Sequence, residues 1–153
     1  MSWRLVLPYP ISANRYWRQA VIKGRAVIFP SKEAKAFKAE VAWKAKGAGI
    51  RTPLEGRVAV HIRLFPQRPQ DWAKRSRLDP DGWADTVRCI DLGNAEKVLS
   101  DALNGVAWKD DKQIHRITLE RCDPDGDARV EIEIAPLASA RIAGDLFEQP
   151  KAA

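Results

Sequence analysis

The sequence predicts an α+β fold, a two-layer sandwich in which two main helices cover a mixed β-sheet. Residues 57–65 alternate strictly between two faces, one of them made of valine, isoleucine and leucine, which is typical of a half-buried strand. Two other segments, 32–48 and 92–104, repeat apolar residues at helical spacing. The predicted order is strand, hairpin, helix, strand, loop, helix, strand and strand, which fits a layered α+β domain.

The segment before the first main helix combines a strand with an aromatic, basic loop. Trp3–Leu7 is a short apolar run that Pro8 ends, and residues 20–28 predict a hairpin that turns at Gly24. Between them, residues 8–18 interleave aromatic side chains with arginines. This pattern suits stacking on bases and pairing with phosphates, and it equally suits a packed loop or a dimer contact. The DNA-contact interpretation selects Asn14, Arg15 and Arg18.

The sequence contains residues typical of helix ends at both main helices. Ser31 is the expected N-cap of the first, and Gly47 falls at its end. Gly105 is the expected stop of the second. These signals agree with the apolar spacing, so both helices are expected in full.

A long basic loop, residues 66–90, separates the central strand from the second helix. Its clusters of proline, arginine, aspartate and glycine predict irregular structure, and loops of this length tend to be functional or mobile. We interpret it as a DNA-contacting flap; the alternative is an insertion without a role. The flap residues assigned to nucleic-acid binding are Arg68, Lys74, Arg75, Arg77 and Arg88.

The C-terminal part predicts two further strands and a tail. Residues 113–121 and 128–135 read as strands, and the Asp125–Gly126 pair between them favours a hairpin. The sequence therefore predicts one domain over residues 1–136 and a peripheral tail over 137–153.

Charge is unevenly distributed along the 153 residues, whose formal net charge is +6. Residues 15–46 contain nine basic and two acidic side chains. This asymmetry indicates either a surface for a polyanion such as nucleic acid, or a solvated helix face dotted with lysine. The sequence has no apolar run of about 18 residues and no signal-peptide pattern. Its two cysteines lack metal-ligand spacing. We therefore expect a cytoplasmic protein with reduced thiols, no zinc and no membrane partner.

Candidate catalytic residues gather on and around the second helix. Asn94, Lys97 and Asp101 fall within about 60° of one another on a helical projection. Asp91 precedes the helix and the pair Asp110–Asp111 follows it, so the two flanking loops are expected to converge. Carboxylates that hold a hard cation, with a lysine between them, suit phosphodiester hydrolysis. The alternatives are an N-cap for Asp91, a simple turn for Asp110–Asp111, and a surface ion pair between Lys97 and Asp101.

The stretch DLGNAEKVLSDALNGVAWKDDKQI resembles the RusA family of Holliday junction resolvases. The positions that match the family pattern are Asp91, Asn94, Lys97, Asp101, Leu103, Asp110, Asp111 and Gln113, and LPYPISANRYWR is similar to the family's N-terminal segment. The resemblance implies a RusA-like fold and a homodimeric endonuclease that depends on Mg²⁺, with Mn²⁺ as a substitute. It would cut four-way DNA junctions by paired incisions in recombination and repair, and such enzymes are common on prophages.

Carried over by position, the resemblance implies metal binding by Asp91 and Asp111, with Asp110 beside them. Lys97 becomes a catalytic base or a phosphate-stabilising residue, and Asn94 a DNA contact.

One position departs from the family pattern, because Gly93 replaces its second aspartate. Three outcomes follow: the remaining aspartates suffice, a neighbour such as Glu96 or Asp101 substitutes, or catalysis is weak or lost. In the last case the chain would be a non-catalytic protein that binds branched DNA. A more distant alternative is an unrelated small α+β protein whose basic face is only solvated.

Overall fold

A four-stranded mixed sheet forms the centre of the computed structural model, which describes residues 1–138. The strand order is β1-β6-β4-β5. β6 is antiparallel to both β1 and β4, whereas β5 runs parallel to β4. The strands are β1 (Trp3–Pro8), β4 (Val58–Phe65), β5 (Ile114–Arg121) and β6 (Arg129–Pro136). The predicted α+β class with a mixed sheet is confirmed.

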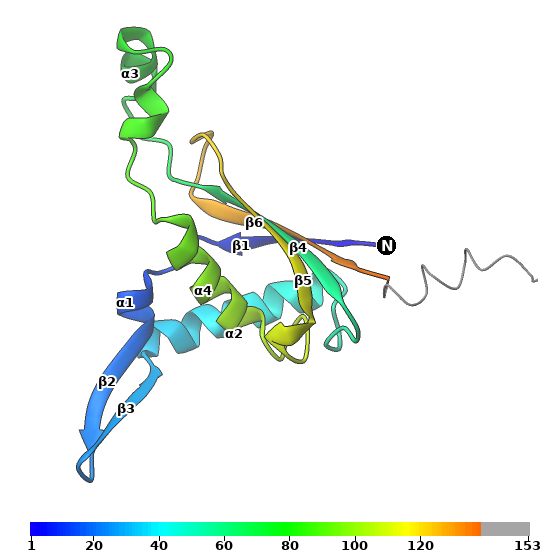
Figure 1. Cartoon of the computed structure of the whole chain (residues 1–153). Helices are drawn as coiled ribbons and strands as arrows, with labels where there is room; N and C mark the ends of the chain where they lie inside the picture. Colours follow the sequence, from blue (N-terminus) through cyan, green and yellow to red (C-terminus); the bar gives the residue numbers. More distant parts are fainter. Residues whose placement is uncertain (139–153) are drawn as a thin grey trace, which may run out of the picture.

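Two main helices, α2 (Lys32–Gly47) and α4 (Leu92–Leu103), cover one face of this sheet (Figure 1). α2 contacts β1 and α4, and α4 contacts β5. Their apolar sides meet the inward residues of the strands in one core, where Val41 and Leu99 are fully buried. The other face of the sheet carries mostly polar side chains, which gives the expected two-layer arrangement.

The predicted helix signals are confirmed. The Ser31 side chain accepts a hydrogen bond from the Ala34 backbone N–H and caps α2. α4 ends at Leu103 and is followed by Gly105, whose φ of 79° favours glycine.

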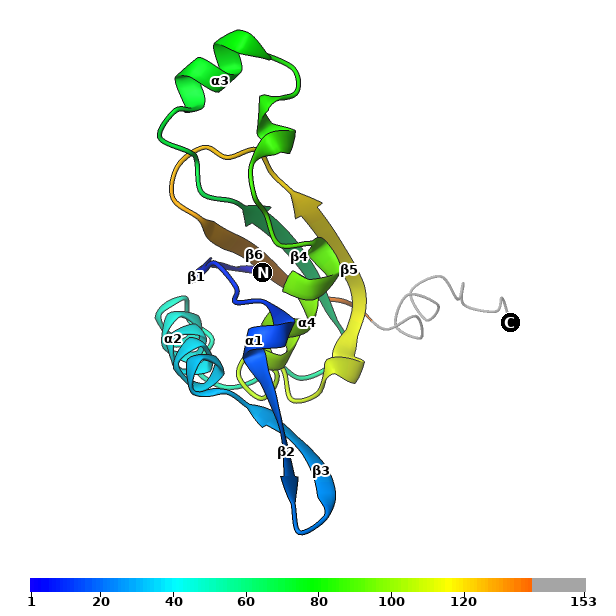
Figure 2. The same ribbon diagram turned by 90° about the vertical axis from the view of Figure 1, so that its left-hand side faces the viewer.

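Two protrusions extend from opposite ends of this body (Figure 2). One is the hairpin of β2 (Trp17–Ile22) and β3 (Arg25–Pro30), attached through the short helix α1 (Ala13–Tyr16). We call this hairpin the arm; its prediction is confirmed, with a turn through Lys23 and Gly24.

The second protrusion corrects the expectation of an irregular loop over residues 66–90. The segment contains helix α3 (Trp72–Leu78) and the short 3-10 helix η1 (Trp83–Thr86), which pack on each other. We call residues 66–88 the head. α3 has no buried residue, so the apolar periodicity that would have predicted a helix is missing.

The predicted hairpin between the last two strands is wrong. β4 lies between β5 and β6 in the sheet, so these two strands do not pair. Asp125 and Gly126 instead belong to a connection that passes over the end of β4, where Gly126 O accepts a hydrogen bond from the Arg68 backbone N–H. The Asp-Gly signal depends on neighbouring residues, so it predicts a bend in the chain but not that another strand lies between β5 and β6.

No helix within residues 1–138 is both long and apolar enough to cross a membrane. The predicted tail, 137–153, lies outside the described residues from position 139 onward.

Candidate active site

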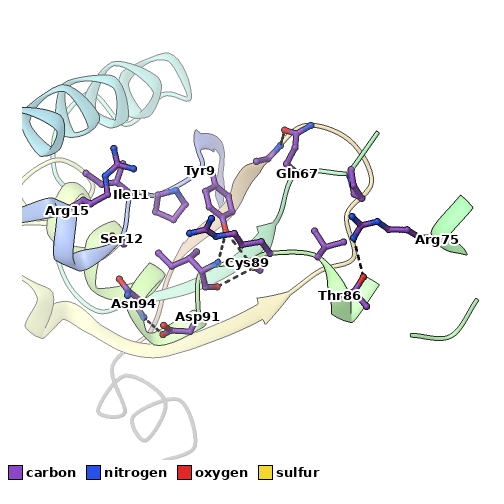
Figure 3. Close-up of a pocket in the computed structure, with 16 residues that line it drawn as sticks. Tyr9, Ile11, Ser12, Arg15, Gln67, Arg75, Thr86, Cys89, Asp91 and Asn94 are labelled. Atoms are coloured by element: carbon purple, nitrogen blue, oxygen red, sulfur yellow. Dashed lines mark hydrogen bonds between the residues drawn. The ribbon is translucent and has the colours of Figure 1, made fainter. Parts of the chain in front are cut away.

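An open cleft of about 910 Å³ lies beside the N-terminal end of α4 (Figure 3). The N-terminal loop lines one side, the head lines the other, and the segment leading into α4 forms its floor. Asp91 is the single acidic residue among the lining residues, and Arg15, Arg75 and Arg88 are the basic ones. One carboxylate thus stands among three guanidinium groups, a surrounding that favours an anionic ligand such as a phosphodiester.

Asp91 occupies this place because it begins α4. Its backbone is extended, and its Oδ1 accepts a hydrogen bond from the Asn94 backbone N–H at 2.8 Å, so the predicted N-cap exists. The side chain is exposed, and Oδ2 has no hydrogen-bond partner within residues 1–138. Capping therefore leaves one carboxylate oxygen available to a ligand.

Two hydrogen bonds tie the N-terminal loop to the start of α4. Asn94 Oδ1 accepts from the Ala13 backbone N–H at 2.6 Å, and the Tyr9 hydroxyl accepts from the Ile90 backbone N–H at 2.7 Å. The Tyr9 hydroxyl also donates to Cys89 Sγ at 3.6 Å. Burial raises the pKa of Tyr9 to about 12, so the phenol is neutral at ordinary pH.

Sequence reasoning did not single out Tyr9, although it selected the loop that contains it. The only available signal was its position between Pro8 and Pro10. Other cleft residues that were missed are Ser12, Gln67 and Thr86.

Asp101, considered above as a replacement for the missing family carboxylate, instead makes contacts that stabilise the fold. The hydroxyl of the buried Tyr16 donates a hydrogen bond to its Oδ2, and Lys38 Nζ lies 3.2 Å from the same oxygen. The pKa of Tyr16 is raised, mainly by burial and secondly by the hydrogen bond with Asp101. Glu96, the other neighbour, accepts a hydrogen bond from Ser100 at 3.0 Å.

Lys97 is exposed near the middle of α4, and no ion pair involves it within residues 1–138. The proposed surface pair with Asp101 is absent there, because Asp101 contacts Lys38 instead. Side chains on a helix lean toward its N-terminus, which directs Lys97 toward the end that carries Asp91.

Asp110 and Asp111 follow the C-terminal end of α4 in the chain. Asp110 caps the short 3-10 helix η2 (Asp111–Gln113) in a capping box with Gln113. Asp111 Oδ1 accepts a hydrogen bond from the indole of the buried Trp108 at 2.8 Å. The expected convergence of the two flanking loops is therefore not seen within one chain.

The acidic residues do not form a complete metal centre in one chain. Residues 1–138 contain no group of three His, Cys, Asp or Glu side chains close enough to hold an ion. Gly93 contributes to this, since an added Cβ there would lie 3.6 Å from Asp91 Oδ1 and meet nothing else within 4 Å. A second carboxylate would fit beside Asp91, but this sequence does not supply it.

The remaining residues predicted to bind DNA lie on the two protrusions. Asn14 and Arg18 are exposed around the base of the arm. In the head, Arg68 stacks over the Trp72 ring at 4.6 Å, and Lys74 and Arg77 are exposed on α3.

The family model of endodeoxyribonuclease RusA matches residues 8–135. The chain belongs to the RusA family. The matched region runs from the end of β1 to the end of β6, so it includes the cleft, α4 and η2. No curated protein matches the sequence. Membership confirms the resemblance and implies an endodeoxyribonuclease of the Holliday junction resolvase type, a class that generally depends on a divalent metal.

Proposed function

We propose that this RusA-family chain is a structure-selective endonuclease that resolves four-way DNA junctions by paired incisions in recombination and repair. It acts as a homodimer, since the two strands to be cut require two active sites related by a two-fold axis. It depends on Mg²⁺, for which Mn²⁺ can substitute.

The observation that carries this proposal is the position of Asp91. Among the described residues it is the only carboxylate that lines the cleft with three arginines, and it lies at the helix start where the family sequence pattern begins. Two of these arginines form exposed ion pairs: Arg15 pairs with Glu33 at 2.8 Å and Arg75 with Asp71 at 2.9 Å. A phosphate can replace either carboxylate at little cost in free energy, because exposed ion pairs are weak.

Each residue has a distinct proposed role. Arg15, Arg75 and Arg88 hold the DNA backbone in the cleft, and Lys97 contacts the scissile phosphate or orients the attacking water. Asp91 and Asp111, with Asp110 beside the latter, are the carboxylates assigned to the metal. The ion, when bound, supplies positive charge that activates water and offsets charge on the phosphate.

The two protrusions extend the proposed DNA surface beyond the cleft. The arm and the head project from opposite ends of the body, with the start of α4 between them (Figure 1). We assign the contacts with duplex on either side of a branch point to Asn14 and Arg18 at the arm and to Arg68, Lys74 and Arg77 on the head.

The test is incision of a labelled synthetic four-way junction, compared with a linear duplex of the same sequence. We expect paired nicks in the junction with Mg²⁺ or Mn²⁺, none with EDTA, and little cutting of the duplex. Equal cutting of both substrates would contradict junction selectivity, and undiminished cutting in EDTA would contradict metal dependence.

A second candidate function is favoured by Gly93. With one family carboxylate missing, the chain could be a non-catalytic protein that binds branched DNA through the same arginines. It would bind junctions with a steep salt dependence and never cut them.

A further inference from the structure

The arm displays a concentration of exposed apolar side chains. Of the eleven large apolar residues that are exposed within residues 1–138, five lie on this hairpin: Val21, Ile22, Val27, Ile28 and Phe29. Successive residues of a strand point to opposite faces, so Val21 and Ile22 make both faces of the arm apolar. A two-stranded hairpin has no second layer to cover such residues, and an apolar surface of this kind marks a binding site.

The tip of the arm, residues 21–25, is a compact apolar end. Val21 keeps 76% of its surface exposed and Ile22 keeps 53%, and both directly precede the turn. The turn residues Lys23 and Gly24 have φ angles of 52° and 76°, positive as a type I′ turn requires. This turn type continues the twist of its two strands, and β-branched side chains are stiff at χ1. The tip therefore presents two stiff apolar side chains at a tight turn.

The charge of the arm is entirely positive. Residues 17–30 contain Arg18, Lys23 and Arg25 and no aspartate or glutamate. None of these three side chains forms an ion pair within the described part of the chain, residues 1–138. The arm of a second copy would bring the same three positive charges, so two arms would repel each other. DNA matches both features of the arm, because it offers phosphates to the cations and base faces to the apolar side chains.

The base of the arm is fixed next to the candidate active site. α1 precedes the arm, and the Ala13 backbone N–H donates a hydrogen bond to the side chain of Asn94, three residues after Asp91. On the other side, the Ser31 backbone N–H donates to Tyr16 O at 2.8 Å and closes the hairpin at its base. From there the arm points away from the body (Figure 2).

The length of the arm decides how far it can enter DNA. Each of its strands has six residues, which span about 20 Å. The major groove of B-DNA admits a two-stranded β-ribbon and is about 8.5 Å deep. An arm that enters DNA along its own axis can therefore reach beyond the floor of the groove, into the base stack.

We propose that the tip of the arm is a wedge that enters the centre of a four-way junction, where Val21 and Ile22 separate stacked bases and Lys23 and Arg25 bind the flanking phosphates. The proposal rests on the proposed function and adds a specificity determinant to it. Insertion of apolar side chains costs least where pairing and stacking are already interrupted, as at a branch point. A linear duplex opposes the wedge with its full stacking energy, so the tip favours junctions over duplex.

Base unstacking is the first test of the wedge. The probe is a four-way junction with 2-aminopurine at the branch point, whose fluorescence rises when the base loses its stacked neighbours. EDTA prevents cleavage during the measurement. We expect the wild type to raise the fluorescence, and the double variant Val21→Ser, Ile22→Ser to bind with a Kd within about threefold and raise it little, since phosphate contacts supply most of the affinity. A double variant that raises the fluorescence as the wild type does would overturn the wedge.

A junction that is already open tests the consequence for cleavage. The double variant should cut an intact junction about tenfold more slowly or worse, because it no longer offsets the cost of unstacking. A junction with mismatched bases at its centre should be cut at similar rates by the variant and the wild type, which also shows that the variant is folded. Equally slow cutting of intact and mismatched junctions by the variant would overturn the wedge.

Ile28→Ser is the matched control. Ile28 is 64% exposed on the same arm, and it pairs with Gln19 at a distance from the turn. This variant should open the branch point and cut as the wild type does. The same loss of fluorescence in Ile28→Ser and in the double variant would overturn the assignment of the wedge to the tip.

The measurements also separate the wedge from the proposed function. A wild type that unstacks the branch point and never cuts would overturn the proposed function and leave the wedge standing. A wild type that cuts junctions without any rise in fluorescence would overturn the wedge alone. A double variant that dissociates to a smaller species in sedimentation velocity, with an unchanged fluorescence signal, would assign the tip to a second copy and also overturn the wedge.

The salt dependence of binding tests the charged part of the tip. The variant Lys23→Gln, Arg25→Gln removes two proposed phosphate contacts. The slope of log Kd against log salt concentration should therefore become shallower by about two for the intact junction. An unchanged slope would overturn the contact between the tip and the DNA backbone.

Discussion

The Tyr9 hydroxyl accepts a hydrogen bond from the backbone N–H of Ile90 at 2.7 Å, one residue before Asp91. This contact joins the N-terminal loop to the residue that starts α4, although the two lie 81 positions apart in the sequence. The orientation of the candidate catalytic carboxylate thus depends on a phenol from the N-terminal side of the cleft.

Tyr9→Phe should loosen the start of α4. The Ile90 N–H loses its acceptor, which should lower the free energy of unfolding by about 1–3 kcal/mol in urea denaturation. Cleavage should fall as well, because Asp91 is less firmly placed. Unchanged stability and activity would show that this contact does not position the site.

The same phenol gives a pH prediction. Its pKa of about 12 in the folded protein exceeds the ordinary value of 10.0, so its contribution to stability is complete below pH 10. That contribution is lost as the pH rises toward 12. Ultraviolet titration should show a late-ionising tyrosine that is absent from Tyr9→Phe; a signal that remains unchanged in the variant would contradict the assignment.

Asp101→Ala should affect stability and spare catalysis. It leaves the hydroxyl of buried Tyr16 without its acceptor and removes the partner of Lys38, so we expect a loss of about 1–3 kcal/mol in the free energy of unfolding. Cleavage per folded molecule should remain near wild type. Asp101→Asn, which retains an oxygen acceptor, is the matched control and should be milder. A large loss of cleavage in both stable variants would instead make Asp101 a replacement catalytic acid.

Gly93→Asp should strengthen metal binding. The added Cβ would lie 3.6 Å from Asp91 Oδ1 with no other contact within 4 Å, and the side chain restores the carboxylate of the family pattern. We expect Mn²⁺ affinity to rise on the order of tenfold, since affinity depends on the number of charged ligands. Gly93→Ala separates the gain in helix propensity from the gain of a ligand. Equal affinity in the two variants would show that position 93 does not face the ion.

Lys97→Ala should reduce cleavage by about 100-fold or more if the side chain acts on the scissile phosphate or the attacking water. Stability should change by less than about 0.5 kcal/mol, because Lys97 is exposed and has no ion pair within the described residues. Lys35→Ala, on the exposed side of α2, is the matched control for lost charge. An equal loss of cleavage in the two variants would show that Lys97 contributes only general positive charge to DNA binding.

Local patterns in the sequence predicted most of the fold. The alternation of β4, the caps of both main helices and the turn of the arm each depend on a few neighbouring residues, and the structure contains all of them. The placement of β4 between β5 and β6 depends on long-range pairing, which an Asp-Gly turn signal does not encode. α3 was missed because it buries nothing.

The sequence predicted which residues belong to the candidate site, but not how these residues lie relative to one another. The N-cap role of Asp91 follows from one position in the sequence, and it is confirmed. Asp91 and Asp111 look close in sequence because a single helix separates them. That helix is rigid and about 18 Å long, so it holds them apart.

The most direct test of the account separates DNA binding from cleavage in Asp91→Asn. Asparagine caps a helix as well as aspartate does, so the variant should fold and bind a four-way junction within about threefold of the wild-type Kd. Its cleavage rate should fall by about 1,000-fold or more, because the variant loses the only carboxylate that residues 1–138 contribute to the cleft. Asp81→Asn, in the head and outside the cleft, should cut normally. An Asp91→Asn variant that still cuts junctions near the wild-type rate would contradict the assignment of this cleft as the active site.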